Sequence, residues 1–283
     1  MSVRNYNKMS LSSFFIFLIY MIFAPRLNKP LYANFLFRPG TRTLEPGRVP
    51  CLEGIQGKNI DFSSKNGSRL NGWYFKQSES RFTILFNHGN AGTIENRVAI
   101  CSLLLKAGYS VFLYDYQGYG YSDGFATIEN VIEDSVSAYD YLVSEQGVKP
   151  EHIVIYGESL GVSVSCHLSD LRKCAALILQ SGFSSLKAIA GHKYPILLLY
   201  PKWLYPMPGL DSLSVLKRSK VPVLIVHGEL DSVIPFSHAE ELFNAISHDK
   251  KQFVLYADCA HSDICTLKPQ EYVEALKGLI SLV

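Results

Sequence analysis

Ser159 lies in the pattern Gly-x-Ser-x-Gly, in the run GESLG at residues 157–161. A short apolar run at residues 153–156 precedes it and a helix-length segment follows, so the pattern predicts a strand-turn-helix unit with the serine at the turn. Such a turn strains the backbone of the serine, and the flanking glycines leave room around it. The N-terminus of the helix also places positive potential where an oxyanion would develop. These features predict that Ser159 is the nucleophile of an acyl-transfer reaction.

The same pattern occurs a second time, around Ser122 at residues 120–124. This copy follows its predicted strand only after six or more residues, in a glycine-rich loop, and its helix begins later. It therefore lacks the strand-turn-helix setting that presents a nucleophile. Ser122 is interpreted as part of a loop that shapes the site.

A serine nucleophile needs a general base, and the base needs a carboxylate that orients it. Asp231 and His261 each follow a short apolar run, at residues 221–226 and 252–256. Ligands of an open α/β sheet meet the carboxyl ends of its strands, so both side chains are expected at the same sheet edge as Ser159. Three nearby carboxylates are alternatives for the acid: Glu229 first, then Asp258 and Asp263.

An oxyanion hole requires two N–H donors near the nucleophile. The backbone N–H of Leu160, directly after the nucleophile, is the first expected donor. The second is expected from the loop HGNAG that follows the strand at residues 82–87, and Asn90 is our choice within it. We interpret His88 as a residue that shapes this loop by hydrogen bonding rather than as a base.

Short apolar runs alternate with helix-length segments from residue 82 onward, and this alternation predicts the elements that position these side chains. It indicates an α/β fold with a mainly parallel central sheet and helices on both faces. Two further strand-like runs, at residues 58–62 and 70–75, flank an Asn-Gly turn and predict a hairpin. The predicted catalytic domain covers residues 58–283, with a proline-rich, cap-like insertion at about 183–219.

Residues 1–57 differ from the rest of the chain in composition. An uninterrupted apolar run at residues 14–24 predicts a membrane anchor or signal segment within residues 1–30. An uncleaved single-pass anchor is the favoured interpretation, and secretion after signal cleavage is the alternative. Because basic residues lie on both sides of the apolar run, the sequence does not determine on which side of the membrane the catalytic domain lies. Residues 31–57 contain many prolines and glycines and are expected to form a linker or irregular arm.

The overall composition excludes several classes. Twenty-seven basic and 25 acidic side chains give a net charge of +2, which argues against a nucleic-acid partner. Six cysteines form no C-x-x-C pair, so no zinc site is expected. Neither a P-loop nor a dinucleotide fingerprint occurs, and no cofactor or metal is expected. The sequence makes no prediction of the oligomeric state.

Five segments occur in the order and spacing of the α/β-hydrolase serine hydrolases: LFNHGNAGTIENR, YDYQGYGYSDG, IYGESLG, VPVLIVHGELDSVIP and AHSD. The chain resembles especially the membrane-anchored abhydrolase-domain proteins and the serine-aminopeptidase/monoacylglycerol-lipase-like family. The resemblance places Ser159, Asp231 and His261 at the triad positions, and Asn90 and Leu160 at the oxyanion positions.

A serine hydrolase that cleaves a carboxylic ester or thioester is the function expected from this resemblance and these residues. The apolar insertion and the N-terminal segment favour a small-molecule or lipid acyl substrate and contact with a membrane. A serine peptidase of the same fold is one alternative, because the fold does not determine which bond is cleaved. A non-catalytic binding protein with a hydrolase fold is the other.

Overall fold

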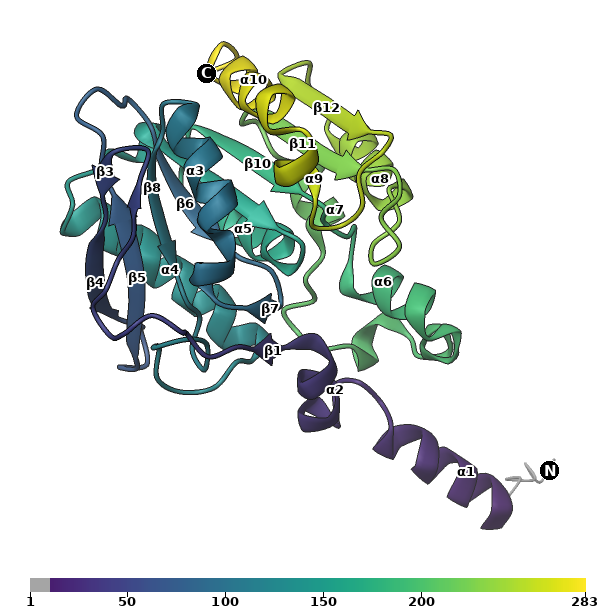
Figure 1. Cartoon of the computed structure of the whole chain (residues 1–283). Helices are drawn as coiled ribbons and strands as arrows, with labels where there is room; N and C mark the ends of the chain where they lie inside the picture. The colour runs from purple at the N-terminus through teal and green to yellow at the C-terminus, as the bar shows by residue number, and fades with distance from the viewer. Residues whose placement is uncertain (1–10) are drawn as a thin grey trace.

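The computed structural model describes residues 11–283. Its central sheet has eight strands in the order β12-β11-β10-β9-β6-β8-β5-β4 (Figure 1). Strands β6, β8, β9, β10, β11 and β12 pair in parallel, while β5 is antiparallel to both β8 and β4. The strands are β4 (Lys58–Ser63), β5 (Arg69–Phe75), β6 (Thr83–Asn87), β8 (Ser110–Tyr114), β9 (Ile153–Glu158), β10 (Ala176–Gln180), β11 (Val223–Gly228) and β12 (Lys251–Tyr256).

Helices cover both faces of this sheet, and two apolar clusters fill the space between the layers. One cluster joins the sheet to α4 (Ile128–Ser144), α5 (Leu160–Leu171), α7 (Ser212–Leu216) and α8 (Ser237–Ala245). The other joins the opposite face to α3 (Val98–Lys106), α9 (Ile264–Leu267) and α10 (Pro269–Ile280). Because both faces are covered, the central strands are continuous apolar runs rather than alternating ones. The predicted α/β class, the parallel core and the hairpin of β4 and β5 are confirmed.

The N-terminal arm is more regular than its composition predicted. Residues 31–57 were expected to be irregular, but α2 (Lys29–Leu36) extends into them, with Pro30 in its first turn, where proline is tolerated. Strand β1 (Arg38–Pro39) then pairs in parallel with β7 (Ala91–Gly92) in the predicted oxyanion loop. The short strands β2 (Cys51–Leu52) and β3 (Ile55–Gln56) pair with each other. The arm is therefore attached to the catalytic domain by backbone pairing.

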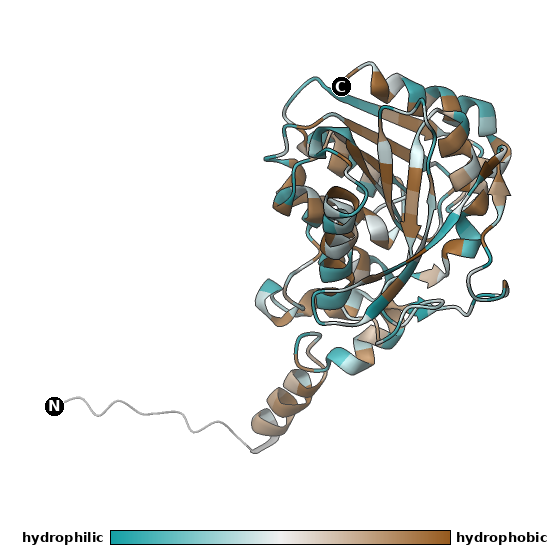
Figure 2. Cartoon of the chain, turned by 90° about the vertical axis from the view of Figure 1, so that its left-hand side faces the viewer, coloured by the Kyte–Doolittle hydropathy of each residue, from teal (hydrophilic) through white to brown (hydrophobic). Residues whose placement is uncertain are grey.

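The predicted anchor segment contains helix α1 (Leu11–Ile22), which projects from the domain in Figures 1 and 2. Among residues 11–283, no helix combines the length and the hydropathy that crossing a bilayer requires. The proline-rich insertion breaks into α6 (Leu186–Lys193), two 3-10 turns, η3 (Pro195–Leu199) and η4 (Lys202–Leu204), and α7, because proline cannot continue a helix. These turns pack against the end of α1 through a small apolar cluster of their own.

Candidate active site

Ser159 lies between the last residue of β9 and the first residue of α5, with φ 55° and ψ −116°. A non-glycine residue at positive φ is strained, and such strain is held where the surrounding structure fixes it. The tight turn depends on its glycines. A Cβ on Gly161 would lie 2.0 Å from the carbonyl oxygen of Asn87, and one on Gly157 would lie 2.4 Å from that of Gly161. The sequence pattern therefore forms the sharp turn that it predicted.

The structure brings Ser159, Asp231 and His261 together at the carboxyl edge of the sheet. The Nε2 of His261 lies 3.1 Å from the Oγ of Ser159, and its Nδ1 lies 2.6 Å from the Oδ2 of Asp231. Since the carboxylate can only accept, the neutral imidazole carries its proton on Nδ1. Its Nε2 lone pair is then free to accept the hydroxyl proton of Ser159.

The carboxylate of Asp231 is buried and held from two sides. Its Oδ1 accepts hydrogen bonds from the backbone N–H groups of Val233 and Ile234, both at 2.8 Å. Burial alone would raise the pKa of this carboxyl, but the hydrogen bonds from His227, His261 and Ile234 outweigh it. The pKa of Asp231 consequently lies well below its usual value, so the group is ionised at neutral pH.

His227 is a neighbour of the site that the sequence analysis did not single out. Its ring is fully buried, and its Nε2 lies 2.9 Å from the carbonyl oxygen of Ile234 and 3.2 Å from the Oδ2 of Asp231. Both partners accept, so Nε2 carries the proton, and it contacts the same carboxylate oxygen of Asp231 that His261 binds. The available signal was its position in the run HGELD, four residues before Asp231 and at the end of a strand.

The three alternative acids lie elsewhere. The side chain of Glu229 is exposed, and Asp258 pairs with Lys268 at 2.8 Å. Asp263 accepts the backbone N–H of Ala260 at 2.7 Å. Of the four carboxylates considered, Asp231 is the one that contacts the imidazole of His261.

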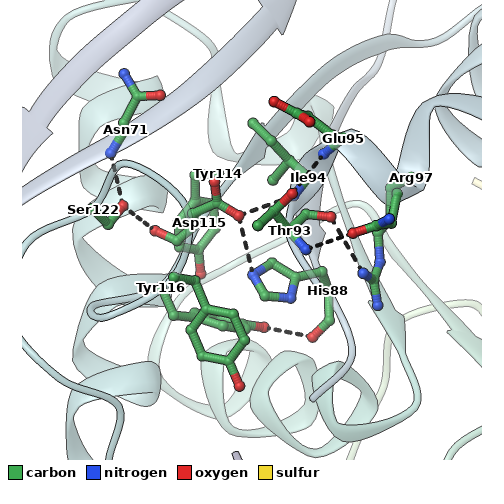
Figure 3. A network of polar contacts seen from close by, with 12 residues as sticks. Asn71, His88, Thr93, Ile94, Glu95, Arg97, Tyr114, Asp115, Tyr116 and Ser122 are labelled. Carbon is green, nitrogen blue, oxygen red and sulfur yellow. Dashed lines mark hydrogen bonds and ion pairs between the residues drawn. The ribbon is translucent and has the colours of Figure 1, made fainter. Parts of the chain in front are cut away.

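The second Gly-x-Ser-x-Gly serine belongs to the scaffold. The Oγ of Ser122 donates to the carbonyl oxygen of Asp115 at 2.6 Å and accepts from the backbone N–H of Asn71 at 2.9 Å (Figure 3). These bonds join a strand to the loop that follows its neighbour. Ser122 thus has the structural position that its loop context predicted.

Asn90 and Leu160 both line the cavity in front of Ser159. The N–H of Leu160 lies in the first turn of α5, where a helix supplies no internal acceptor. The peptide between Gly89 and Asn90 is oriented by His88, whose Nδ1 lies 2.7 Å from the carbonyl oxygen of Gly89. In a trans peptide the N–H points opposite to the carbonyl, so this bond sets the direction of the Asn90 N–H.

Burial of His88, and then the charge of Arg97, lower the pKa of this imidazole well below its usual value. The ring is therefore neutral, and it packs against both Tyr116 and Tyr119, with ring centroids 4.2 and 5.1 Å away. The Nε2 of His88 lies 3.8 Å from the Oδ1 of Asp115, and Figure 3 shows the two side chains next to each other. His88 shapes the loop, as its sequence context predicted.

A buried ion pair ties the same loop to the nucleophile turn. The Nε of Arg97 donates to the Oε2 of Glu158 at 2.8 Å, and this oxygen also accepts the N–H of Gly89 at 3.3 Å. Another nitrogen of Arg97 donates to the carbonyl oxygen of Ala91 at 2.6 Å. Since Glu158 immediately precedes Ser159, the pair fixes the predicted oxyanion donors relative to the serine.

A cavity of about 680 Å³ opens beside Ser159. Its inner wall is buried and apolar, and comes from the insertion, α4, α5 and the loop after β11. Another part of the wall comes from α2 in the N-terminal arm. The inner lining includes Leu160, Phe183, Ile189, Leu197 and Ile234. The segment expected to be a linker thus contributes to the site. Among residues 11–283, no cluster of three or more potential metal ligands is present.

Comparisons with known proteins agree with this geometry. The sequence profile of the prolyl oligopeptidase family matches residues 97–263, more than half of the chain. An uncharacterized protein of Mycobacterium tuberculosis is 30% identical over 83% of this chain and 84% of its own length. Alpha/beta hydrolase domain-containing protein 17C of Xenopus tropicalis is 33% identical over 71% of this chain and 62% of its own length.

The solved structure of an esterase from Pyrococcus furiosus has the same fold, with a TM-score of 0.71. It is 19% identical to this chain, and the match covers 86% of this chain and 97% of the esterase. The family profile spans the turn around Ser159, the loop with Asp231 and the residue His261. The chain therefore belongs to the prolyl oligopeptidase family of α/β hydrolases.

Proposed function

We propose that this hydrolase cleaves a carboxylic ester or thioester with an apolar acyl group, through an acyl-enzyme on Ser159. The observation that carries the proposal is the apolar cavity that opens directly beside the Oγ of Ser159. A volume of about 680 Å³ lies within the range of small-molecule sites. Its apolar lining suits a hydrocarbon chain, because burial of each methylene removes apolar surface from water.

The reaction begins when the Oγ of Ser159 attacks the acyl carbon and its proton passes to the Nε2 of His261. Asp231 keeps the imidazole in the required tautomer and stabilises the imidazolium. The developing oxyanion accepts hydrogen bonds from the backbone N–H groups of Leu160 and Asn90. His261 then gives the proton to the departing alcohol or thiol, which leaves the acyl group on Ser159.

Deacylation repeats these steps with water as the nucleophile. His261 takes a proton from the water, which attacks the acyl-serine carbonyl, and the same two N–H groups bind the second oxyanion. The bond to the Oγ of Ser159 breaks, and the serine recovers its proton from His261. The products are the free acid and the unchanged enzyme.

Peptide-bond hydrolysis is the second candidate, because the chain belongs to a family named for a peptidase. A peptide substrate requires hydrogen-bonding partners for its own backbone, whereas the buried wall of this cavity is largely apolar. The single acidic residue in the lining, Glu129, pairs with Lys29 rather than facing a substrate amine. These observations favour an ester over a peptide.

A panel of p-nitrophenyl esters, from acetate to long-chain acids, tests the proposal beside a panel of aminoacyl p-nitroanilides. We expect kcat/KM to rise with chain length by up to about fourfold per methylene until the cavity is filled. Ala190→Phe, on the cavity wall, should reduce the long-chain rates selectively, while the volume-conserving Ala190→Ser should not. Activity that falls steadily beyond acetate, or that favours the anilides, would contradict the proposal.

A further inference from the structure

Helix α1 exposes apolar side chains around its whole circumference. The six consecutive residues from Phe14 to Ile19 are all apolar, and 42–69% of each is exposed. A helix that is apolar on all sides is stable only in apolar surroundings. Something apolar must therefore cover α1 when the protein is in its working environment.

The C-terminal end of α1 is fastened to the insertion. The hydroxyl of Tyr20 donates to the carbonyl oxygen of Leu199 at 3.0 Å, and the hydroxyl of Tyr200 donates to the carbonyl oxygen of Tyr20 at 3.1 Å. The two rings stack with centroids 4.4 Å apart, and Ala24 is buried beneath them. Whatever covers α1 therefore lies next to the insertion as well.

The insertion adds its own exposed apolar side chains to this surface. We define the cap surface as five residues, each 54–69% exposed: Ile196, Leu198, Leu199, Trp203 and Met207. Ile196 also lines the cavity, and Tyr194 beside it contacts Phe35 of α2 with ring centroids 6.2 Å apart. The apolar surface thus runs from α1 over the insertion to the entrance of the cavity. Figure 2 shows the apolar α1 projecting from the domain.

The two chain segments that form this surface carry basic side chains and no acidic ones. Residues 1–44 contain six basic side chains and no acidic one, and residues 183–210 contain three lysines and no acidic residue. Three of these nine side chains pair with acids outside the two segments: Lys29 with Glu129, Lys202 with Asp211, and the buried Arg42 with Asp115. An apolar surface flanked by basic side chains complements a bilayer that contains anionic phospholipid.

We propose that α1 and the cap surface together dock on an anionic phospholipid bilayer, with the entrance of the cavity at the membrane. The acyl chain of a substrate then passes between bilayer and cavity without crossing water. This inference goes beyond the proposed reaction, because it concerns binding to lipid and is measured without turnover.

Tryptophan fluorescence of the full-length protein tests the docking. Trp203 lies on the cap surface and is 60% exposed, whereas the other tryptophan, Trp73, is fully buried in the domain. We expect phosphatidylcholine vesicles that contain phosphatidylglycerol to shift the emission of Trp203 to shorter wavelength, and brominated phospholipids to quench it. Trp203→Phe should abolish both changes. Vesicles of phosphatidylcholine alone should bind at least about tenfold more weakly.

A pair of variants separates the cap surface from α1. Leu198→Ser with Leu199→Ser should weaken vesicle binding about tenfold or more. The matched control is Leu171→Ser, an exposed leucine at the end of α5, which should bind as the wild type does. The Ser159→Ala protein should also bind normally, so failure of the proposed reaction is distinguishable from failure of docking. Binding of each variant is measured by co-flotation with the vesicles. The proposal would be overturned if the wild-type protein did not float with the vesicles, or if it floated but brominated phospholipid did not quench Trp203.

Discussion

Arg97→Met should loosen the loop that carries one of the proposed oxyanion donors. The guanidinium of Arg97 bonds to Glu158, to the carbonyl oxygen of Ala91 and, at 3.2 Å, to that of Thr93. Its side chain is 9% exposed and that of Glu158 is 13% exposed. The substitution leaves a carboxylate without its cation in a largely dry environment, next to the nucleophile.

The expected loss of stability follows from this burial. Removal of one partner of a buried ion pair costs about 3–5 kcal/mol, and the remaining solvent access places Arg97→Met near ~3 kcal/mol. For a chain of this size, that loss corresponds to a decrease in melting temperature of roughly 6–12 °C. The double variant Arg97→Met/Glu158→Gln removes the stranded charge and should recover part of the loss.

The value of kcat should show the effect of Arg97→Met on the position of the loop, separately from its effect on stability. If the ion pair holds the N–H of Asn90 in place, Arg97→Met should lower kcat by about 10²-fold, comparable to loss of one oxyanion donor. The double variant should recover part of the stability but not kcat, because the guanidinium that joins Glu158 to the carbonyl oxygens of the loop is absent in both. Thermal denaturation and ester hydrolysis below the melting transition measure the two effects. If Arg97→Met alone retained the wild-type kcat, this account of the loop would be refuted.

Three further changes test other parts of the site. Asp231→Asn should lower kcat by about 10⁴-fold, since the imidazole loses its orienting anion. Despite burial, hydrogen bonds depress the pKa of Asp231, so its stabilising effect is present above about pH 4 and is lost as the pH falls. The denaturation midpoints of wild type and Asp231→Asn should therefore converge in acid, and a constant difference would contradict the assignment. Gly161→Ala should prevent soluble expression, because its Cβ would lie 2.0 Å from a backbone oxygen. Recovery of folded, active Gly161→Ala protein would show that the turn is less tightly packed. Ser122→Ala should cost about 1–2 kcal/mol of stability, measured by urea denaturation, yet retain kcat, since its hydroxyl bonds only to backbone groups. Loss of kcat in this variant would contradict a purely structural role.

The sheet and the positions of Ser159, Asp231 and His261 at its edge could be predicted from local patterns. Continuous apolar runs indicate buried parallel strands, and the functional residues of such a sheet lie in the loops that follow the carboxyl ends of its strands. The contact between the three side chains agrees with their predicted proximity, while their catalytic roles remain a proposal.

Other features depend on tertiary contacts that a local pattern does not encode. The proline and glycine content of residues 31–57 concealed α2, because its helix is stabilised by contact with the domain rather than by propensity. The pairing of Arg38 with Ala91 joins segments more than fifty residues apart. The position of His227 at the end of a strand, four residues before Asp231, was visible in the sequence, but its contact with the carboxylate depends on the fold of the loop between them.

Covalent labelling with a fluorophosphonate probe tests the central claim most directly, because the probe reacts only with a serine that an adjacent base activates. The account predicts stoichiometric labelling at Ser159 in the wild-type protein, almost none in Ser159→Ala and strongly reduced labelling in the His261→Ala variant. Ser122→Ala should label as the wild type does. Undiminished labelling of Ser159→Ala would contradict the assignment of the nucleophile, and absence of labelling in the folded wild type would favour a non-catalytic binding protein.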